Sequence, residues 1–244
     1  MQFWIYLRDI LKGDFGESLQ FGVPAIEVVR ERFANTIELV VAALALAVSI
    51  GVLGGLIAAL RRDRITDFLI STLAIVGQSM PSFWLGILLI QFFALDLGWL
   101  PTSGQGGISH LVLPAVTLAA YLIPNFVLIT RAGVIETINE QFVVTARAKG
   151  VSNLRVLFLH VLPNTLNPIL SFLGLQIGKL IGGSIVTESI YAWPGVGRLL
   201  VGSIFQRDIP VVTAAIFVMC IVIILANLIV DIALSMIDPR IRGA

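Results

Sequence analysis

Long apolar runs separated by short polar stretches make up most of this 244-residue sequence. Five of the runs reach the roughly 20 residues that a membrane-spanning helix needs. The pattern predicts an all-α, polytopic membrane helix bundle with about five spanning helices over residues 34–244, preceded by a mixed amphipathic segment, residues 1–33, that forms a surface helix and loop. The five runs are Ala34–Leu60, Phe68–Leu95, Leu111–Thr130, Asn167–Thr187 and Val211–Met236.

Breaks and close contacts are expected inside these runs. Pro81 lies in the middle of the second run, where it should kink or break the helix. The polar residues around it, Gln78, Ser79 and Ser82, either line a solute pathway or satisfy backbone groups that the break leaves free. Glycines spaced four residues apart let a neighbouring helix approach closely. The candidate packing positions are Gly51, Gly55, Gly174, Gly178 and Gly182.

Two charges fall well inside apolar runs, Lys179 and Asp231, whereas Glu38 lies at a span end. A charge within the membrane is costly and marks a candidate functional residue, so Lys179 joins the possible pathway residues. Alternatively, each side chain reaches the membrane surface or pairs with a neighbour. Lys179 also ends a stretch that starts at Gly174 and looks superficially like a phosphate loop. The glycine spacing is one residue too short and no Ser or Thr follows the lysine, so we expect no ATP binding by this motif.

The longest polar interruption, Thr137–Pro163, predicts two short helices joined by a turn. Thr137 and Glu140 have the spacing of a capping box, and Gly150 should stop the first helix. Three residues of that helix, Phe142, Val143 and Ala146, should share one face.

The second short helix should begin at Ser152, a good N-cap residue, and end near Pro163. The remaining loops differ from Thr137–Pro163 in length and composition. We expect Arg131 to end the third apolar run and Glu188–Pro210 to form a loop. Trp193 suits a membrane interface, and Glu188 should lie at a span end, also at the interface.

Lys and Arg are distributed unevenly between the two sets of loops. By the positive-inside rule, the richer set is cytoplasmic and the N-terminus is extracytoplasmic. Outside the N-terminal segment, the poorer set holds only Arg198 and Arg207. The richer set holds Arg61, Arg62, Arg64, Arg131, Arg147, Lys149, Arg155, Arg240 and Arg242.

Composition narrows the class of function. Hydrophobic residues make up 57% and charged residues 13% of the chain, against about 45–50% and about 25% in a typical soluble domain. The net charge of +1 argues against a nucleic-acid partner. Cys220 is the single cysteine, which excludes a disulfide framework. His110 and His160 lie in different loops, so no metal site is expected.

The segment around Gly150 resembles a loop of the inner-membrane permease subunits of ATP-binding-cassette importers. Their signature is Glu-Ala-Ala, three residues, Gly, nine residues, Ile, one residue, Leu-Pro. Ala146, Gly150, Leu162 and Pro163 match it, whereas Val144, Thr145 and His160 depart from it. The string Thr145–Gly150 looks like the variant of the dipeptide, oligopeptide and nickel branch. Further motifs of that branch are Gly13–Gly16, Pro81–Gly86, Trp193–Arg198 and Asp238–Arg242.

This resemblance implies a type I importer transmembrane domain. The family's first helix would precede Met1, and residues 1–33 would be an extracytoplasmic segment. Residues 137–163 would form the cytoplasmic coupling loop that docks the ATPase. The residues that would couple to it are Phe142, Thr145, Ala146, Arg147, Ala148, Lys149, Gly150, Leu162 and Pro163.

The resemblance also implies partners. They would be a second homologous permease, two cytoplasmic ATPase subunits and an extracytoplasmic binding protein, all at the inner membrane. The chain would bind no cofactor and catalyse no reaction, because ATP and Mg²⁺ would be bound by the ATPase subunits. The cargo would be a peptide or a related solute such as glutathione or a nickel complex.

Two other classes of function remain as alternatives. A stand-alone secondary transporter or channel would need inverted repeats or ion-coordinating groups inside the membrane. An intramembrane enzyme would need a nucleophile and a base, or metal ligands, at one depth.

Overall fold

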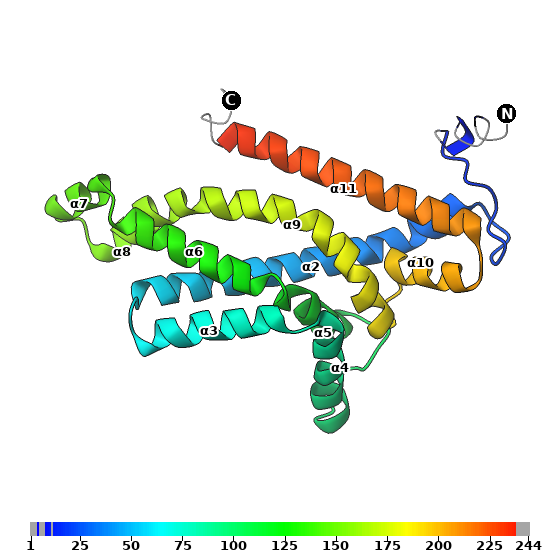
Figure 1. The fold of residues 1–244 in the computed structure, drawn as a ribbon, viewed down its shortest axis with the longest axis horizontal. Coiled ribbons are helices and arrows are strands. Elements are labelled where there is room, and N and C mark those ends of the chain that lie inside the picture. Colours follow the sequence, from blue (N-terminus) through cyan, green and yellow to red (C-terminus); the bar gives the residue numbers. More distant parts are fainter. Residues whose placement is uncertain (1–3, 5–7, 11, 238–244) are drawn as a thin grey trace. The chain divides into compact units, whose positions relative to one another are not determined.

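A computed structural model describes residue 4, residues 8–10 and residues 12–237, without the side chains of residue 231 and residues 233–237. Throughout this described part, the regular elements are helices (Figure 1). They are α2 (Ala25–Leu60), α3 (Ile65–Ser79), α4 (Ser82–Leu89), the π-helix η1 (Ile90–Asp96), α5 (Ile108–Ala120), α6 (Ile123–Ile138), α7 (Gln141–Ala148), α8 (Asn153–Val156), the π-helix η2 (Leu157–Val161), α9 (Leu162–Ile190), α10 (Val196–Phe205) and α11 (Ile209–Ile237).

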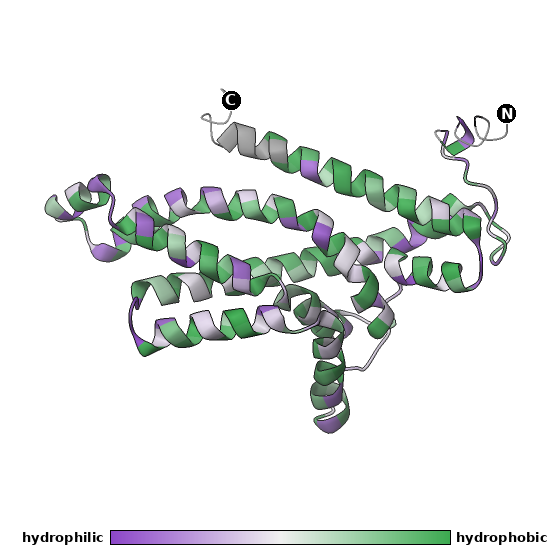
Figure 2. Cartoon of the chain, in the orientation of Figure 1, coloured by the Kyte–Doolittle hydropathy of each residue, from purple (hydrophilic) through white to green (hydrophobic). Residues whose placement is uncertain are grey.

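Three stretches of helix in the described residues are long and apolar enough to cross a membrane. They are α2, the continuous run Asn153–Ile190, and Ile209–Val230 of α11. The number rises to five if the broken pairs α3 with α4–η1 and α5 with α6 each count as one span, which agrees with the predicted bundle. Figure 2 shows apolar residues along most of α11 and hydrophilic residues gathered at α7 and at the turn between α2 and α3.

The chain divides into two compact units, and several helices contribute to both. Unit 1 comprises the described residues of Met1–Ala43, Ser82–Leu118 and Gly178–Leu225. Unit 2 comprises those of Leu44–Pro81, Ala119–Ile177 and Ala226–Ala244.

In unit 2, glycines of α2 bring that helix into direct contact with α6. A Cβ atom at Gly51 would overlap that of Phe126, and one at Gly55 would lie 2.6 Å from the Cβ of Thr130. Both glycines had been predicted as packing positions, and the two backbones meet where they lie. On α9, a Cβ at Gly174 would overlap Val230, again within unit 2.

The other two candidate packing glycines lie in the unit 1 part of α9 and differ from each other. A Cβ at Gly178 would approach Ile223 to 3.1 Å, whereas none of the described atoms comes within 4 Å of one at Gly182. A packing role for Gly182 therefore stays a prediction.

Several helix boundaries differ from the predicted ones. The break at Pro81 is confirmed, because α3 ends at Ser79 and α4 begins at Ser82. Arg131, however, does not end a helix. It lies inside α6, where its Nε and Nη2 atoms donate to the two carboxylate oxygens of Asp67 at 2.6 and 2.7 Å. This bidentate ion pair compensates the cost of partly burying the charge of Arg131. Helix α6 can therefore continue past Arg131 to Ile138.

Three further boundaries are corrected. The first long helix begins at Ala25 rather than Ala34. The helix expected to end near Pro163 instead passes through η2 into α9, which begins at Leu162 and contains Pro163 as its second residue. The expected loop Glu188–Pro210 contains α10.

The possible pathway residues have different environments. The Gln78 side chain is exposed and donates to Asn125 at 3.4 Å, and the Ser79 hydroxyl donates to the Ile75 carbonyl of its own helix at 3.1 Å. Ser82 is half-buried and Lys179 is exposed. Asp238–Arg242 and the Asp231 side chain lie outside the described residues.

Candidate functional site

The predicted loop between the third and fourth apolar runs forms α7 and α8. Thr137 does not cap α7 as expected. It lies in the last turn of α6 and donates its hydroxyl to the Gly133 carbonyl at 2.7 Å. Glu140 takes the N-cap position of α7, without a side-chain capping bond. Ser152 is the N-cap residue of α8, as predicted, again without a side-chain bond.

The C-terminus of α7 is closed by a Schellman motif. Gly150 has a φ of +80°, in the left-handed region that favours glycine. Its N–H donates to the Arg147 carbonyl at 2.9 Å, and the N–H of Val151 donates to the Ala146 carbonyl at 3.2 Å. These two bonds define the motif and confirm Gly150 as the helix stop.

One face of α7 is fixed in the apolar core of unit 2. Val143 is fully buried, and Ala146 packs at the edge of the same cluster. The cluster joins α7 to the end of α2, to α6, to α8 and to η2. Its buried members are Ala59, Val134, Val143, Val156, Leu157 and Val161.

The opposite face of α7 is free. Phe142 is 42% exposed, so it does not share the buried face of Val143 and Ala146 as predicted. The other predicted coupling residues of the loop are exposed as well, namely Thr145, Arg147, Ala148, Lys149 and Gly150. At the start of α9, Leu162 is half-buried and Pro163 is exposed.

A pocket of about 430 Å³ lies next to Arg147 of α7, within unit 2. The wall of this pocket contains an arginine of α7 and mostly apolar residues of α2, α6, α8 and η2. A pocket of this size can receive one or two apolar side chains from another protein. The lining residues are Leu60, Ile138, Arg147, Asn153, Leu154, Val156, Leu157 and Val161.

Unit 1 contains a second site, centred on the buried carboxylate of Glu188 at the end of α9. Its Oε1 atom accepts the hydroxyl protons of Thr36 at 2.8 Å and of Ser184 at 3.2 Å. Its Oε2 atom accepts the backbone N–H of Arg198 at 3.0 Å, so it caps α10. Glu188 is fully buried and not interfacial as expected.

The Pro-Gly segment after α9 is shaped by this carboxylate. A Cβ atom at Gly195 would overlap the carboxyl group of Glu188, and one at Gly197 would lie 2.6 Å from the Cα of Ile185 and 2.9 Å from the Oε2 atom of Glu188. Only residues without a side chain fit there. Trp193 is 1% exposed and donates its Nε1–H to the Asn35 carbonyl at 2.9 Å, so the predicted interfacial position is wrong.

Tyr191 extends the same network. Its hydroxyl lies 2.8 Å from that of Thr117 and donates to the Gly86 carbonyl at 3.1 Å. Burial raises the pKa of the Tyr191 phenol, and this effect outweighs the opposing hydrogen bond with Thr117. The neutral hydroxyl therefore ties α4, α5 and the segment after α9 together.

The N-terminal loop is attached to unit 1 through Asp208, a buried residue between α10 and α11. Its Oδ2 atom accepts the Ser18 hydroxyl at 2.5 Å and the Gln20 N–H at 3.2 Å. Burial alone would raise the pKa of Asp208, but these hydrogen bonds outweigh it and lower the pKa below its ordinary value of 3.8. Phe15 adds a ring contact with Phe217 at 5.3 Å.

Sequence reasoning assigned no role to Thr36, Tyr191 or Asp208 and misplaced Glu188. The available signal was the motif Trp193–Arg198, whose two glycines lie against the Glu188 carboxylate and the Ile185 backbone. Across the described residues, no group of three or more His, Cys, Asp or Glu side chains could hold a metal ion.

Solved structures share this fold. The structure described as an inward facing conformation of the MetNI methionine ABC transporter matches 86% of this chain and 96% of its own, with a TM-score of 0.71 and 17% identity. An amino acid ABC transporter matches with a TM-score of 0.60 and 20% identity. The fold is therefore that of the transmembrane domain of a type I ATP-binding-cassette importer.

The sequence comparisons agree with this fold and also identify the protein family. A sequence model of the family described as "Binding-protein-dependent transport system inner membrane component" matches residues 51–243, and the chain belongs to this family. The glutathione transport system permease proteins GsiC of Escherichia coli (strain K12) and Salmonella typhimurium are each 43% identical over 99% of this chain and 79% of their own length.

The chain is thus the permease subunit of an importer, located in the inner membrane. Membership of this family implies an ATPase and a binding protein as partners.

Proposed function

We propose that this permease pairs with a second, homologous permease and is driven by two cytoplasmic ATPase subunits, which bind ATP and Mg²⁺. An extracytoplasmic binding protein delivers the cargo, a small peptide-like solute of the glutathione class. The cargo assignment rests on the 43% identity to permeases named for glutathione transport.

The observation that carries the proposal is the two-sided environment of α7. Its inner face is fixed by Val143, while Phe142, Thr145 and Lys149 of its outer face are exposed. An exposed face beside an apolar pocket of about 430 Å³ suits the docking of another protein, because central apolar anchors in pockets dominate binding energy.

The mechanism follows from how α7 is attached. Its buried face contacts α6, α8 and η2 through one cluster, and η2 continues directly into α9. A movement of the ATPase against α7 therefore acts on helices that run into the membrane. Packed apolar cores transmit such displacements because they have low compressibility.

Gly150 gives the sharpest test, because the described atoms leave the space around it open. A side chain at its positive φ costs about 1 kcal/mol whatever its size. Gly150→Ala and Gly150→Trp therefore carry similar backbone strain, but only tryptophan projects into the docking surface. We expect the Trp variant to insert normally and to lose both co-purification of the ATPase and cargo-stimulated ATP hydrolysis, while the Ala variant keeps most of both.

Equal activity and equal co-purification of the two variants would place the ATPase elsewhere. The cargo is tested separately by uptake of labelled glutathione into proteoliposomes with the cognate binding protein, in competition with a dipeptide and with Ni²⁺. Uptake that is blocked by Ni²⁺ but not by peptides would reject the peptide-like class.

A further inference from the structure

A second pocket, of about 280 Å³, lies in unit 1 among segments that the proposed mechanism does not use. It is enclosed by the N-terminal loop, the start of α2, the Pro-Gly segment after α9 and α10. A volume of this size holds a single side chain or a very small acid, since drug-sized ligands need roughly 300–1,000 Å³.

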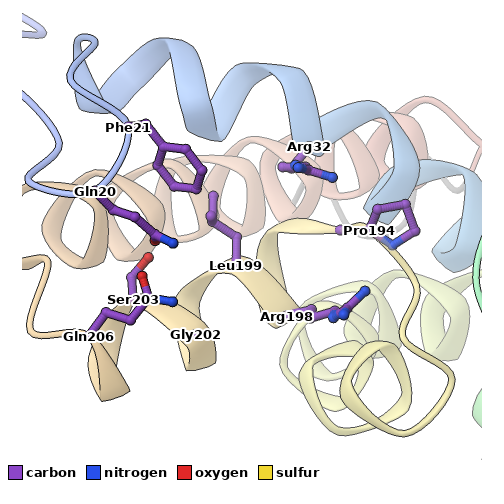
Figure 3. A pocket seen from close by; sticks show the side chains of 10 residues that line it. Gln20, Phe21, Arg32, Pro194, Arg198, Leu199, Gly202, Ser203 and Gln206 are labelled. Atoms are coloured by element: carbon purple, nitrogen blue, oxygen red, sulfur yellow. The ribbon is translucent and has the colours of Figure 1, made fainter.

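The pocket has two chemically different ends (Figure 3). Arg32 and Arg198 lie toward one end, and Gln20, Ser203 and Gln206 gather at the other. Phe21 and Leu199 stand between the two ends. Two guanidinium groups suit a carboxylate, and amide and hydroxyl groups suit the peptide groups beside it.

The guanidinium groups of Arg32 and Arg198 at the first end have no ion pair within the described residues, although the buried Glu188 accepts the backbone N–H of Arg198. The guanidinium of Arg198 is held by a hydrogen bond from Nη1 to the Ala192 carbonyl at 2.5 Å. Arg32 has no hydrogen bond to any described residue, so it is free to meet a ligand.

Ser203 is a second and independent sign of a ligand. Its side chain is 1% exposed, and its Oγ atom has no hydrogen-bond partner among the described residues. Buried polar atoms without partners are rare in native proteins, because each costs roughly 1–3 kcal/mol. A ligand that accepts or donates at this hydroxyl would supply the missing bond.

We infer that this pocket receives an acidic side chain, with its adjoining peptide group, from the extracytoplasmic binding protein. The carboxylate binds Arg32 and Arg198, and the peptide group binds Gln20, Gln206 and the Ser203 hydroxyl. The inference rests on the proposed function, because it needs a binding protein as partner.

The direction of approach favours a protein over the cargo. The pocket is built mainly from residues outside the spanning helices, on the side that the Lys and Arg distribution predicts to be extracytoplasmic. The N-terminal loop that supplies Gln20 and Phe21 is held there by the buried Asp208. A preformed pocket at this position meets a docking protein before any cargo enters the membrane.

The test measures binding of the purified, cargo-free cognate binding protein to the complete importer in lipid nanodiscs, without nucleotide. Arg32→Gln removes no hydrogen bond or ion pair within the described residues and should leave the melting temperature nearly unchanged. It should weaken binding roughly tenfold and flatten the dependence of Kd on salt concentration. The matched control is Arg30→Gln, an exposed arginine of α2 outside the pocket, which should change Kd less than about twofold.

Two further variants make the outcome decisive. Arg198→Gln should weaken binding, whereas Arg207→Gln, an exposed arginine beyond α10 that does not line the pocket, should not. Ser203→Ala should weaken binding about threefold if its hydroxyl meets the ligand. Without a ligand role, removal of an unpaired buried hydroxyl would raise the melting temperature and leave Kd unchanged.

An unchanged Kd and salt dependence for Arg32→Gln would overturn the inference, even if uptake of an acidic cargo fell, because the pocket would then bind the cargo. The measurement uses neither ATP nor transport. Loss of ATPase coupling in the Gly150 variants therefore does not affect it, and the two proposals fail separately.

Discussion

The two units hold their loops by opposite kinds of interaction. In unit 1, the buried Glu188 accepts hydrogen bonds from Thr36, Ser184 and the backbone of Arg198. In unit 2, Val143 holds α7 through apolar contacts alone. Hydrogen bonds weaken steeply when they are misaligned, whereas the hydrophobic effect has no direction. The network of unit 1 therefore selects one geometry through bond direction, and the cluster of unit 2 holds α7 in one packed body with α6, α8 and η2.

This difference matches the roles proposed for the two regions. In the proposed function α7 moves with the ATPase, and its apolar cluster moves α6, α8 and η2 with it. The pocket proposed for a docking protein needs a fixed shape, and the directional network holds the start of α10, which lines it. Unit 2 does contain one polar tie, the Asp67–Arg131 ion pair, but it links α3 to α6 rather than to α7.

The largest effect on this difference between the units is expected from substitutions at Glu188. Glu188→Ala leaves a buried hydroxyl and the first N–H groups of α10 without acceptors, which should cost about 3–5 kcal/mol. We expect little folded protein, measured as the monodisperse fraction in detergent. Glu188→Gln keeps one acceptor oxygen at the same position and should be affected less. If both variants stay folded equally well, the network does not organise unit 1.

A smaller effect is expected at Val143. Val143→Ala removes two buried methyl groups and should cost about 2 kcal/mol, seen as a lower melting temperature. Val144→Ala removes the same groups from a side chain that is 59% exposed and should change stability by less than about 0.5 kcal/mol. Similar losses for these two neighbours would contradict the burial of only one face of α7.

The smallest effect is a pH dependence carried by Asp208. Its pKa is lower in the folded chain than the ordinary 3.8. Its stabilisation is therefore complete above that value and is lost as the pH falls toward the pKa of the folded state. Asp208→Asn should lose about 1 kcal/mol at neutral pH. It should also show a smaller fall in melting temperature between about pH 6 and about pH 3 than the unmodified protein.

A pH response that Asp208→Asn does not alter would mean that other carboxylates control acid sensitivity. Val143→Ala serves as the control, because an apolar substitution removes no titrating group. It should lower the melting temperature by the same amount at every pH.

Features that depend on nearby residues were predictable from the sequence. Gly150 ends α7 because the chain there has a positive φ, which favours glycine. Pro81 breaks a helix because its ring removes the backbone N–H donor. The apolar runs predicted up to five spans, because a helix crosses a membrane when it is long and apolar enough. These properties are local and need no knowledge of the folded chain.

Features that depend on distant partners were not predictable. Arg131 was expected to end a helix, but Asp67 pairs with it from a position 64 residues away in the sequence. Glu188 was placed at an interface, yet Thr36, 152 residues away, makes its burial possible. Thr137 had the spacing of a capping residue, but the helix before it continued and its hydroxyl bonded back to Gly133.

The reactivity of Cys220 can report what covers the helix around it. It is the single cysteine of the sequence and lies exposed on the unit 1 part of α11. A water-soluble alkylating reagent reaches a thiol only where water has access to it. The alkylation rate of this one native thiol therefore reports whether water, or instead lipid or another subunit, covers this stretch of α11. The alkylation rate of Cys220 can be followed as the importer assembles, without introducing another cysteine.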